Sequence, residues 1–253
     1  ESLPHGGPSK VNRENDGLGI CARLAHFVFG ERIAKLNLNE DMVQRARRAA
    51  ARQPRAVQVS LLAALEAWAN AGMSTENYSP DEVSIIVAGH NISQADQFKA
   101  FLKYQEQPED TSARYALQYL DTNHLGVVSE VLGVQGEGFS LGAASASGNM
   151  GLLQAHRQIS FGLNKVCILV AAMADLSPVE LQAFRQTGAM GGKRFGNEPE
   201  QACRPFDEDR EGFIYGQGAA CLILENAAAA AARSAPRWLS LIHISEPTRL
   251  SLI

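Results

Sequence analysis

Three short apolar runs are separated along the chain by segments with helical periodicity. The runs cover residues 83–89, 165–172 and 213–225. Short apolar runs that are bounded by polar or turn-forming residues indicate buried strands. Because these strands alternate with helical segments, the sequence predicts an α/β domain built from packed layers.

The segment between residues 40 and 73 has the composition and the apolar spacing of helix. Pro54 interrupts this segment, so we expect two helices or a break at that point. Gly72 is expected to end the second part. By contrast, residues 91–110 are polar and are expected to form an exposed excursion.

Helical periodicity returns in residues 111–133, 147–162 and 178–188. Three residues are expected to mark helix ends: Thr111 as an N-cap, Gly133 as a stop and Pro178 in a first turn. The helix at 147–162 is amphipathic. Its apolar side chains are expected on one side: Met150, Leu153 and Ile159.

Composition narrows the classes of function that this chain can have. Of its 253 residues, 45% are hydrophobic and 20% charged, which is ordinary for a globular protein. A net charge of −4 gives no reason to expect nucleic acid or an anionic membrane as a partner, and no Cys/His cluster has metal-ligand spacing. No apolar run approaches the roughly 20 residues that span a bilayer. Cys167 and Cys221 lie in apolar runs and are expected to be buried free thiols, so we expect a cytoplasmic protein.

The two ends of the chain differ from its middle. Residues 1–39 are predicted to be a loop-rich N-terminal remnant, because their first part is rich in Gly, Pro and Asn. Residues 227–239 are rich in alanine and carry only helix propensity. Residues 240–253 resemble the translation of a sequencing adapter and are left out of the fold. The predicted domain is residues 40–226, and we expect it to be a fragment of a longer gene product.

Small residues crowd the segment Leu141–Asn149, which reads LGAASASGN. They permit a sharp turn from a strand into a helix, with the backbone close to any ligand. Ser145 then lies at a helix N-terminus, where exposed N–H groups favour negative charge. A thiol would become a good nucleophile there, whereas a serine hydroxyl needs a dedicated base. The alternative is that Ser145 or Ser147 caps the helix; the glycine spacing does not fit a nucleophile elbow.

Several segments resemble, in order and spacing, the ketosynthases of fatty-acid and polyketide synthesis. The most specific one is RPFDEDREGFIYGQGAACLILE at 204–225, which carries R-P-F-D, then R-x-G-F, then G-x-G-A and an apolar strand. The segment 57–73 resembles the family's helix before a strand that ends in glycine. The segment 113–149 resembles the stretch that leads through a dimer-contacting helix to the nucleophile turn. The resemblance covers roughly residues 49–225.

This resemblance implies a thiolase-like layered α/β fold, of which the chain holds only the N-terminal half. It puts Ser145 at the position of the family's cysteine nucleophile and Phe184 near a position that lines the acyl channel. The family's two catalytic histidines and its lysine belong to the other half, and none of the six histidines here sits in their motifs: His5, His26, His90, His124, His156 and His243. It further implies an acyl carrier protein as partner, a substrate on its phosphopantetheine arm, no cofactor, and a homodimer in the full-length form.

With serine in place of cysteine and the segments LDTNHLGVVSEVLG and ASASGN, the chain most resembles the free-standing decarboxylative ketosynthases of polyketide β-branching cassettes. This implies conversion of malonyl to acetyl on the carrier protein without carbon–carbon bond formation. Loss of the thiolate abolishes acyl transfer, but decarboxylation needs only donors that stabilise the enolate oxygen. The alternatives are a condensing ketosynthase with a Cys-to-Ser change, a non-catalytic dimer partner and, remotely, a serine hydrolase. Because half of the site is absent, we expect this chain to be inactive alone, with an incompletely covered sheet that makes it aggregate.

Overall fold

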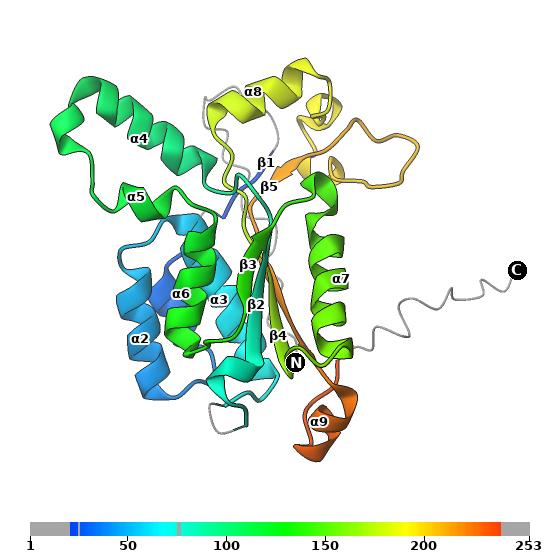
Figure 1. The fold of residues 1–253 in the computed structure, drawn as a ribbon. Coiled ribbons are helices and arrows are strands. Elements are labelled where there is room, and N and C mark those ends of the chain that lie inside the picture. The colour runs from blue at the N-terminus through cyan, green and yellow to red at the C-terminus, as the bar shows by residue number, and fades with distance from the viewer. Residues whose placement is uncertain (1–20, 25, 75–76, 239–253) are drawn as a thin grey trace, which may run out of the picture.

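A four-stranded sheet forms the centre of the molecule, in the order β3-β2-β4-β6 (Figure 1). The computed structural model describes residues 21–24, 26–74 and 77–238. The strands of this sheet are β2 (Val83–Ala88), β3 (Gly138–Leu141), β4 (Val166–Ala171) and β6 (Ala220–Glu225). β2 pairs in parallel with both β3 and β4, and β6 runs antiparallel to β4. The α/β layered fold is therefore confirmed.

The first two predicted strands are confirmed as β2 and β4, but the third prediction is wrong as a single strand. Residues 213–225 divide into β6 and a short strand, β5 (Tyr215–Gly216), which pairs in parallel with β1 (Cys21–Ala22) in a separate two-stranded sheet. Two glycines, Gly216 and Gly218, interrupt the apolar run and favour the bend between the two strands.

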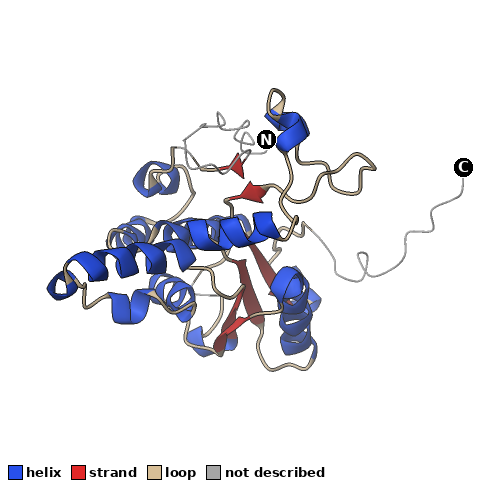
Figure 2. Cartoon of the chain, turned by 90° about the horizontal axis from the view of Figure 1, so that it is seen from above, coloured by secondary structure: helices blue, strands red, loops and turns tan. Residues whose placement is uncertain are grey.

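One face of the sheet carries the main hydrophobic core. The helices α3 (Arg55–Asn70) and α6 (Thr122–Leu132) contact the sheet (Figure 1), and α1 (Phe29–Ile33) and α2 (Glu40–Ala50) pack against them. Seen from above, helices lie on both sides of the strands (Figure 2). The break at Pro54 is confirmed, because this residue is the N-cap of α3. α1 lies inside the segment that was predicted to be rich in loops, and both Phe29 and Ile33 are buried in the core.

The opposite face is covered by α7 (Ser147–Ser160), which contacts β2, β4 and β6. The predicted apolar side of this helix is confirmed only in part: Ile159 packs against the core of this face, whereas Leu153 is 40% exposed and Met150 is only partly buried. The buried side chains are instead small or polar: Ser147, Gly151, Ala155 and Gln158. The reason is the close approach of helix and sheet. A Cβ at Gly151 would lie 2.7 Å from Leu169 Cδ1 and 3.1 Å from Ala88 Cβ.

The predicted exposed excursion at 91–110 is confirmed from α4 (Gln94–Glu106) onward, since this helix has no buried residue. It is wrong at the start of the segment, where Ile92 and Ser93 are buried. The predicted helix at 111–133 is divided into α5 (Tyr115–Gln118) and α6. Thr111 is not an N-cap, since its hydroxyl donates to the Pro108 carbonyl at the end of a 3₁₀ turn. The stop at Gly133 is confirmed by its left-handed backbone, with φ of 71°.

The helix α8 (Pro178–Gln186) follows β4 and confirms the prediction for this segment. Pro178 occupies its first turn. Ser177 caps it by accepting from the Val179 amide, and Glu180 accepts in return from the Ser177 amide. α8 lies at the end of the sheet to which the parallel strands point (Figure 1).

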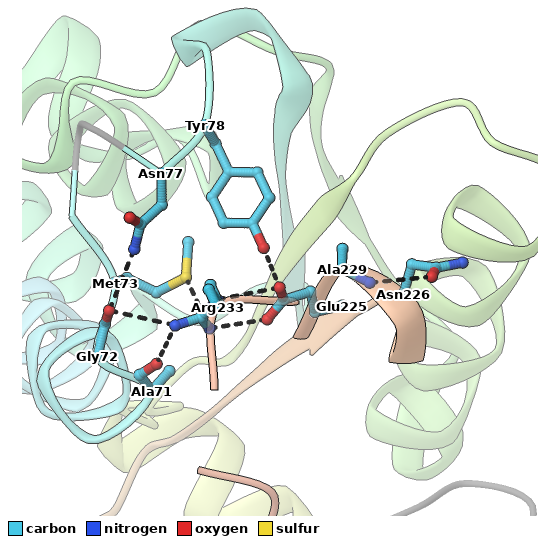
Figure 3. A network of polar contacts seen from close by, with 9 residues as sticks. All are labelled: Ala71, Gly72, Met73, Asn77, Tyr78, Glu225, Asn226, Ala229 and Arg233. Carbon is cyan, nitrogen blue, oxygen red and sulfur yellow. Dashed lines mark hydrogen bonds and ion pairs between the residues drawn. The ribbon is translucent and has the colours of Figure 1, made fainter. Parts of the chain in front are cut away.

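The alanine-rich segment begins with α9 (Ala227–Ala232), and it is tied to the body of the protein by an arginine (Figure 3). The Arg233 guanidinium donates to the Glu225 carboxylate at 2.7 Å and 3.0 Å, and to the Ala71 carbonyl at 2.9 Å. The Tyr78 hydroxyl donates to the same carboxylate. Burial raises the pKa of Tyr78 to about 12, and the hydrogen bond to Glu225 acts in the same direction. This network joins the end of β6 to the end of α3.

Two further properties concern the described part of the chain as a whole. None of its helices is long and apolar enough to cross a membrane. The domain boundaries at residues 40 and 226 stay predictions, and the adapter-like tail at 240–253 lies outside the described residues.

Candidate active site

The carboxyl ends of the three parallel strands meet at one edge of the sheet. Residues that follow such strands gather at that edge, which is where ligands bind in open parallel sheets. His90 comes two residues after β2, Ser145 comes four residues after β3, and α8 follows β4. The topology therefore brings the predicted nucleophile position and one histidine to the same side of the molecule (Figure 1).

The turn that carries Ser145 is short and has an unusual backbone. It is a single 3₁₀ turn, Ala144–Ala146, between β3 and α7. Ala144 has a φ of 48°, in the left-handed region that alanine rarely adopts. Ser145 is exposed at this turn. Its side chain is thus displayed beside the first turn of a 14-residue helix.

Ser147 holds the turn in place. Its hydroxyl accepts a hydrogen bond from the Ala143 amide at 2.9 Å and donates one to the Ala144 carbonyl at 2.7 Å. Neither serine caps α7 as an N-cap, because that position is Ala146. The alternative that Ser145 or Ser147 is the N-cap of α7 is therefore wrong. Ser147 stabilises the turn, and Ser145 is left free for another role.

The Ser145 hydroxyl makes no hydrogen bond with any other residue that the structure describes. A serine nucleophile is activated by a base within hydrogen-bond reach, which is about 2.6–3.2 Å. No described side chain accepts a hydrogen bond from this hydroxyl. The arrangement does not favour Ser145 as an attacking group, and it does not support the serine hydrolase alternative.

His90 lies against the turn, although it matches no family motif and is not among the predicted site residues. A Cβ at Gly142 would lie 2.5 Å from His90 Nδ1 and 2.7 Å from its Cγ. The ring therefore occupies the space that any larger residue at 142 would need. The imidazole is exposed and has no hydrogen-bond partner among the described residues. One signal could have found it: a polar residue directly after a buried parallel strand.

The backbone beside His90 is held by Asp121. The carboxylate of Asp121 accepts from the Asn91 amide at 2.7 Å and from the Ile92 amide at 3.1 Å. Asn91 has a φ of 53°, which asparagine tolerates better than most residues. These bonds fix the turn after β2, and with it the place of the imidazole.

Phe184 lies on α8 and is 38% exposed. Its ring packs edge-on against Phe213, with centroids 5.3 Å apart and planes at 82°. No hydrogen bond or ring contact of the described residues joins Phe184 to the turn at Ser145. Its place in an acyl channel stays a prediction.

The other histidines take no part in this site. His124 is wholly buried, and its Nδ1 lies 3.1 Å from Ser60 Oγ. Burial lowers the pKa of His124 to about 4, against an opposing effect of Asp121. His156 is exposed on α7, 3.3 Å from Ser160 Oγ. His26 is exposed, and His5 and His243 lie outside the described residues.

The described residues bring neither a metal-binding cluster nor a thiol to the turn at 141–149, and their one exposed free cysteine, Cys203, lies outside this turn. They contain no group of three or more His, Cys, Asp or Glu side chains that could hold a metal ion. Cys167 is buried in β4, and burial raises the pKa of its thiol to about 11. Such a thiol is inert at neutral pH. The prediction of a buried free thiol is confirmed at Cys167. It is wrong at Cys221, which is only partly buried because it lies on the outer strand β6.

Residues 29–230 match the model of the beta-ketoacyl synthase N-terminal domain, so the chain belongs to the ketosynthase family. It is 34% identical over 232 residues to the polyketide biosynthesis malonyl-ACP decarboxylase PksF of Bacillus subtilis (strain 168), an alignment with 92% of this chain and 52% of that protein. It is 26% identical to the 3-oxoacyl-[acyl-carrier-protein] synthase 2 of Staphylococcus aureus (strain N315), over 76% of this chain and 46% of that one. The chain spans about half the length of these relatives.

Solved ketosynthases share the fold. A beta-ketoacyl synthase from Burkholderia phymatum STM815 superposes with a TM-score of 0.67 at 24% identity, covering 85% of this chain and 50% of that one. The ishigamide ketosynthase/chain length factor gives 0.68 at 21% identity, covering 88% and 51%. The predicted fold, the N-terminal half of a thiolase-like ketosynthase, is thereby confirmed.

Proposed function

We propose that this chain is part of a ketosynthase-like decarboxylase that converts malonyl-ACP to acetyl-ACP in polyketide β-branching. One observation carries the proposal: Ser145 stands at the strand-to-helix turn of a ketosynthase domain, exposed and without a hydrogen-bond partner among the described residues. The relative PksF, which is a malonyl-ACP decarboxylase by name, supports the same reaction.

The chemistry agrees with a serine at this position. Condensation needs a thiolate that takes an acyl group, whereas decarboxylation does not. Breaking the bond between the methylene and the carboxylate releases carbon dioxide and leaves the electron pair in a thioester enolate. Hydrogen-bond donors aimed at the enolate oxygen stabilise that state. In our proposal Ser145 shapes the pocket, and the two family histidines of the other half supply those donors.

The proposal includes the partners of the reaction. The substrate is carried on the phosphopantetheine arm of an acyl carrier protein, and the full-length protein is a homodimer. The described residues provide one wall of the site, at the carboxyl edge of β2, β3 and β4. For this reason we propose that the chain is inactive without the remaining part of the site.

A second candidate function, condensation, is favoured by the similarity of the chain to condensing enzymes. The chain is similar to 3-oxoacyl-[acyl-carrier-protein] synthases, which are condensing enzymes by name. In that alternative, Ser145 is a substitution in an enzyme that is otherwise built for condensation.

The test uses the full-length protein, a malonyl-loaded carrier protein and mass spectrometry of the carrier. We expect acetyl-carrier as the product, both for the wild type and for Ser145→Ala, because the hydroxyl does not attack. Ser145→Cys is the variant that separates the two functions. Efficient formation of a β-ketoacyl-carrier by Ser145→Cys would support the condensing alternative, and absence of acetyl-carrier with the wild type would support a non-catalytic partner.

A further inference from the structure

The decarboxylation proposed above ends in a step that a condensing enzyme does not need. In condensation the carbon of the enolate attacks an acyl group that is held on the side chain at the nucleophile turn. In decarboxylation the same carbon must instead receive a proton. A donor for that proton is expected beside the turn that carries Ser145, because in condensation the same carbon attacks an acyl group that is held there.

The imidazole of His90 is the group that the structure places against this turn. Its Nδ1 lies 2.5 Å from the position of a Cβ at Gly142, and Ser145 follows Gly142 by three residues. Three residues of chain span at most about 11 Å, and the 3₁₀ turn shortens this. The Ala146 amide donates to the Ala143 carbonyl at 2.9 Å, which folds the turn back on itself. The ring therefore contacts the beginning of the segment that carries Ser145 three residues later.

Backbone hydrogen bonds hold the chain on both sides of His90. Before His90, the hydrogen bonding between β2 and β3 continues one residue past the end of β2, because the Gly89 amide donates to the Leu141 carbonyl at 2.9 Å. Asp121 then holds the turn from the other side, through the Asn91 and Ile92 amides. The ring is exposed and has no partner among the described residues, so its nitrogens are available to a ligand.

We propose that His90 is the proton donor that converts the enolate to the acetyl thioester. An N–H bond of the imidazolium breaks, a C–H bond forms at the enolate carbon, and the enolate electron pair becomes that bond as the thioester carbonyl is restored. The neutral ring then takes its next proton from water. This inference rests on the proposed function, because it assigns a residue to the second half of the same reaction.

The test measures steady-state conversion of malonyl-carrier to acetyl-carrier by the full-length protein and its variants. For His90→Ala we expect kcat to fall by roughly 10²- to 10⁴-fold, the usual contribution of a positioned acid, with KM little changed. Added imidazole should restore part of this rate in His90→Ala, since a small acid can enter the space that the ring leaves. His90→Gln, which keeps hydrogen bonding but cannot transfer a proton, should be as slow as His90→Ala.

Two variants keep the result interpretable. His156→Ala removes an exposed histidine of α7 away from the turn and should keep the wild-type rate. Gly142→Ala keeps the imidazole but displaces it, because the new Cβ needs the space of the ring; its kcat should fall as well. Circular dichroism and thermal unfolding show that each variant is folded.

The outcomes separate this inference from the function on which it rests. If the wild type decarboxylates and His90→Ala keeps its kcat, the inference is wrong and the proposed function stands. A slow His90→Ala without rescue by imidazole, together with a fast His90→Gln, also contradicts proton transfer, because it indicates a role in hydrogen bonding alone. A wild type that produces no acetyl-carrier contradicts the proposed function itself.

Discussion

The two faces of the sheet are packed in different ways. On one face, α3 and α6 bury large apolar side chains, among them Leu61, Leu65 and Val128, against the β-branched residues of β2 and β4. On the other face, α7 buries small and polar side chains and leaves Leu153 exposed. Each face also holds a buried contact between two polar side chains: His124 with Ser60 on the first, and Gln158 with Ser84 on the second.

This difference indicates that the two faces have different roles: one contributes most of the folding free energy, and the other positions the candidate site. Large side chains on the α3 face exclude most apolar area from water, which is the main source of folding free energy. Small side chains on the α7 face bring that helix close to the sheet. Because Ser145 stands directly before α7, close packing of the helix fixes the position of the candidate site.

The largest effect is expected on the α3 face. Leu65→Ala removes a side chain that is 0% exposed, and should lower the free energy of unfolding by about 2–5 kcal/mol. The same substitution on the other face, Leu153→Ala, removes a side chain that is 40% exposed in this chain and should cost much less. Chemical denaturation of this chain and its two variants measures both. Equal losses would contradict the described difference between the faces.

A pH effect should also arise on the α3 face. The pKa of His124 is 6.5 in the unfolded chain and about 4 in the folded one, so the folded protein favours the neutral ring. The stability that the neutral His124 ring contributes to the folded protein is therefore fully present above pH 6.5 and is lost as the pH falls from 6.5 toward 4. The loss amounts to roughly 3 kcal/mol in the free energy of unfolding. Denaturation curves at several pH values measure it, and His124→Gln should flatten this part of the profile.

A smaller effect should appear on the α7 face. Gly151→Ala puts a Cβ at 2.7 Å from Leu169 Cδ1 and should cost about 1–3 kcal/mol of stability. Gly148→Ala is the matched control on the same helix, because its Cβ would meet nothing within 4 Å. That control should be neutral or stabilising by about 0.4–1 kcal/mol. A harmless Gly151→Ala would show that α7 does not depend on this close approach.

Much of the fold could be predicted from the sequence, because local signals agree with it. The buried runs at β2 and β4, the break at Pro54 and the stop at Gly133 all follow from residue types that act on their own backbone. The buried side of α7 could not be predicted in this way. Apolar periodicity points to Leu153, but the distance between helix and sheet selects small residues, and that distance is a tertiary property.

The candidate site was predicted in part. The small residues at 141–149 indicated the turn, and the resemblance indicated Ser145. His90 was missed, because a lone histidine carries no motif and becomes part of the site only when β2 and β3 are paired in register. Ser147 was considered as a cap, but its hydroxyl bonds to the turn that precedes the helix. The contact of His90 joins two segments, whereas the bonds of Ser147 lie within the segment 141–149 and depend on the backbone of its turn.

The central claim is that the serine at the turn marks a decarboxylase that no longer uses a nucleophile at this position. The most direct measurement is the rate at which the full-length protein converts malonyl-carrier to acetyl-carrier, compared between the wild type and Ser145→Ala. The account predicts that both produce acetyl-carrier at similar rates and that neither forms an acyl-enzyme. An acyl group found on Ser145, with loss of turnover in Ser145→Ala, would contradict it.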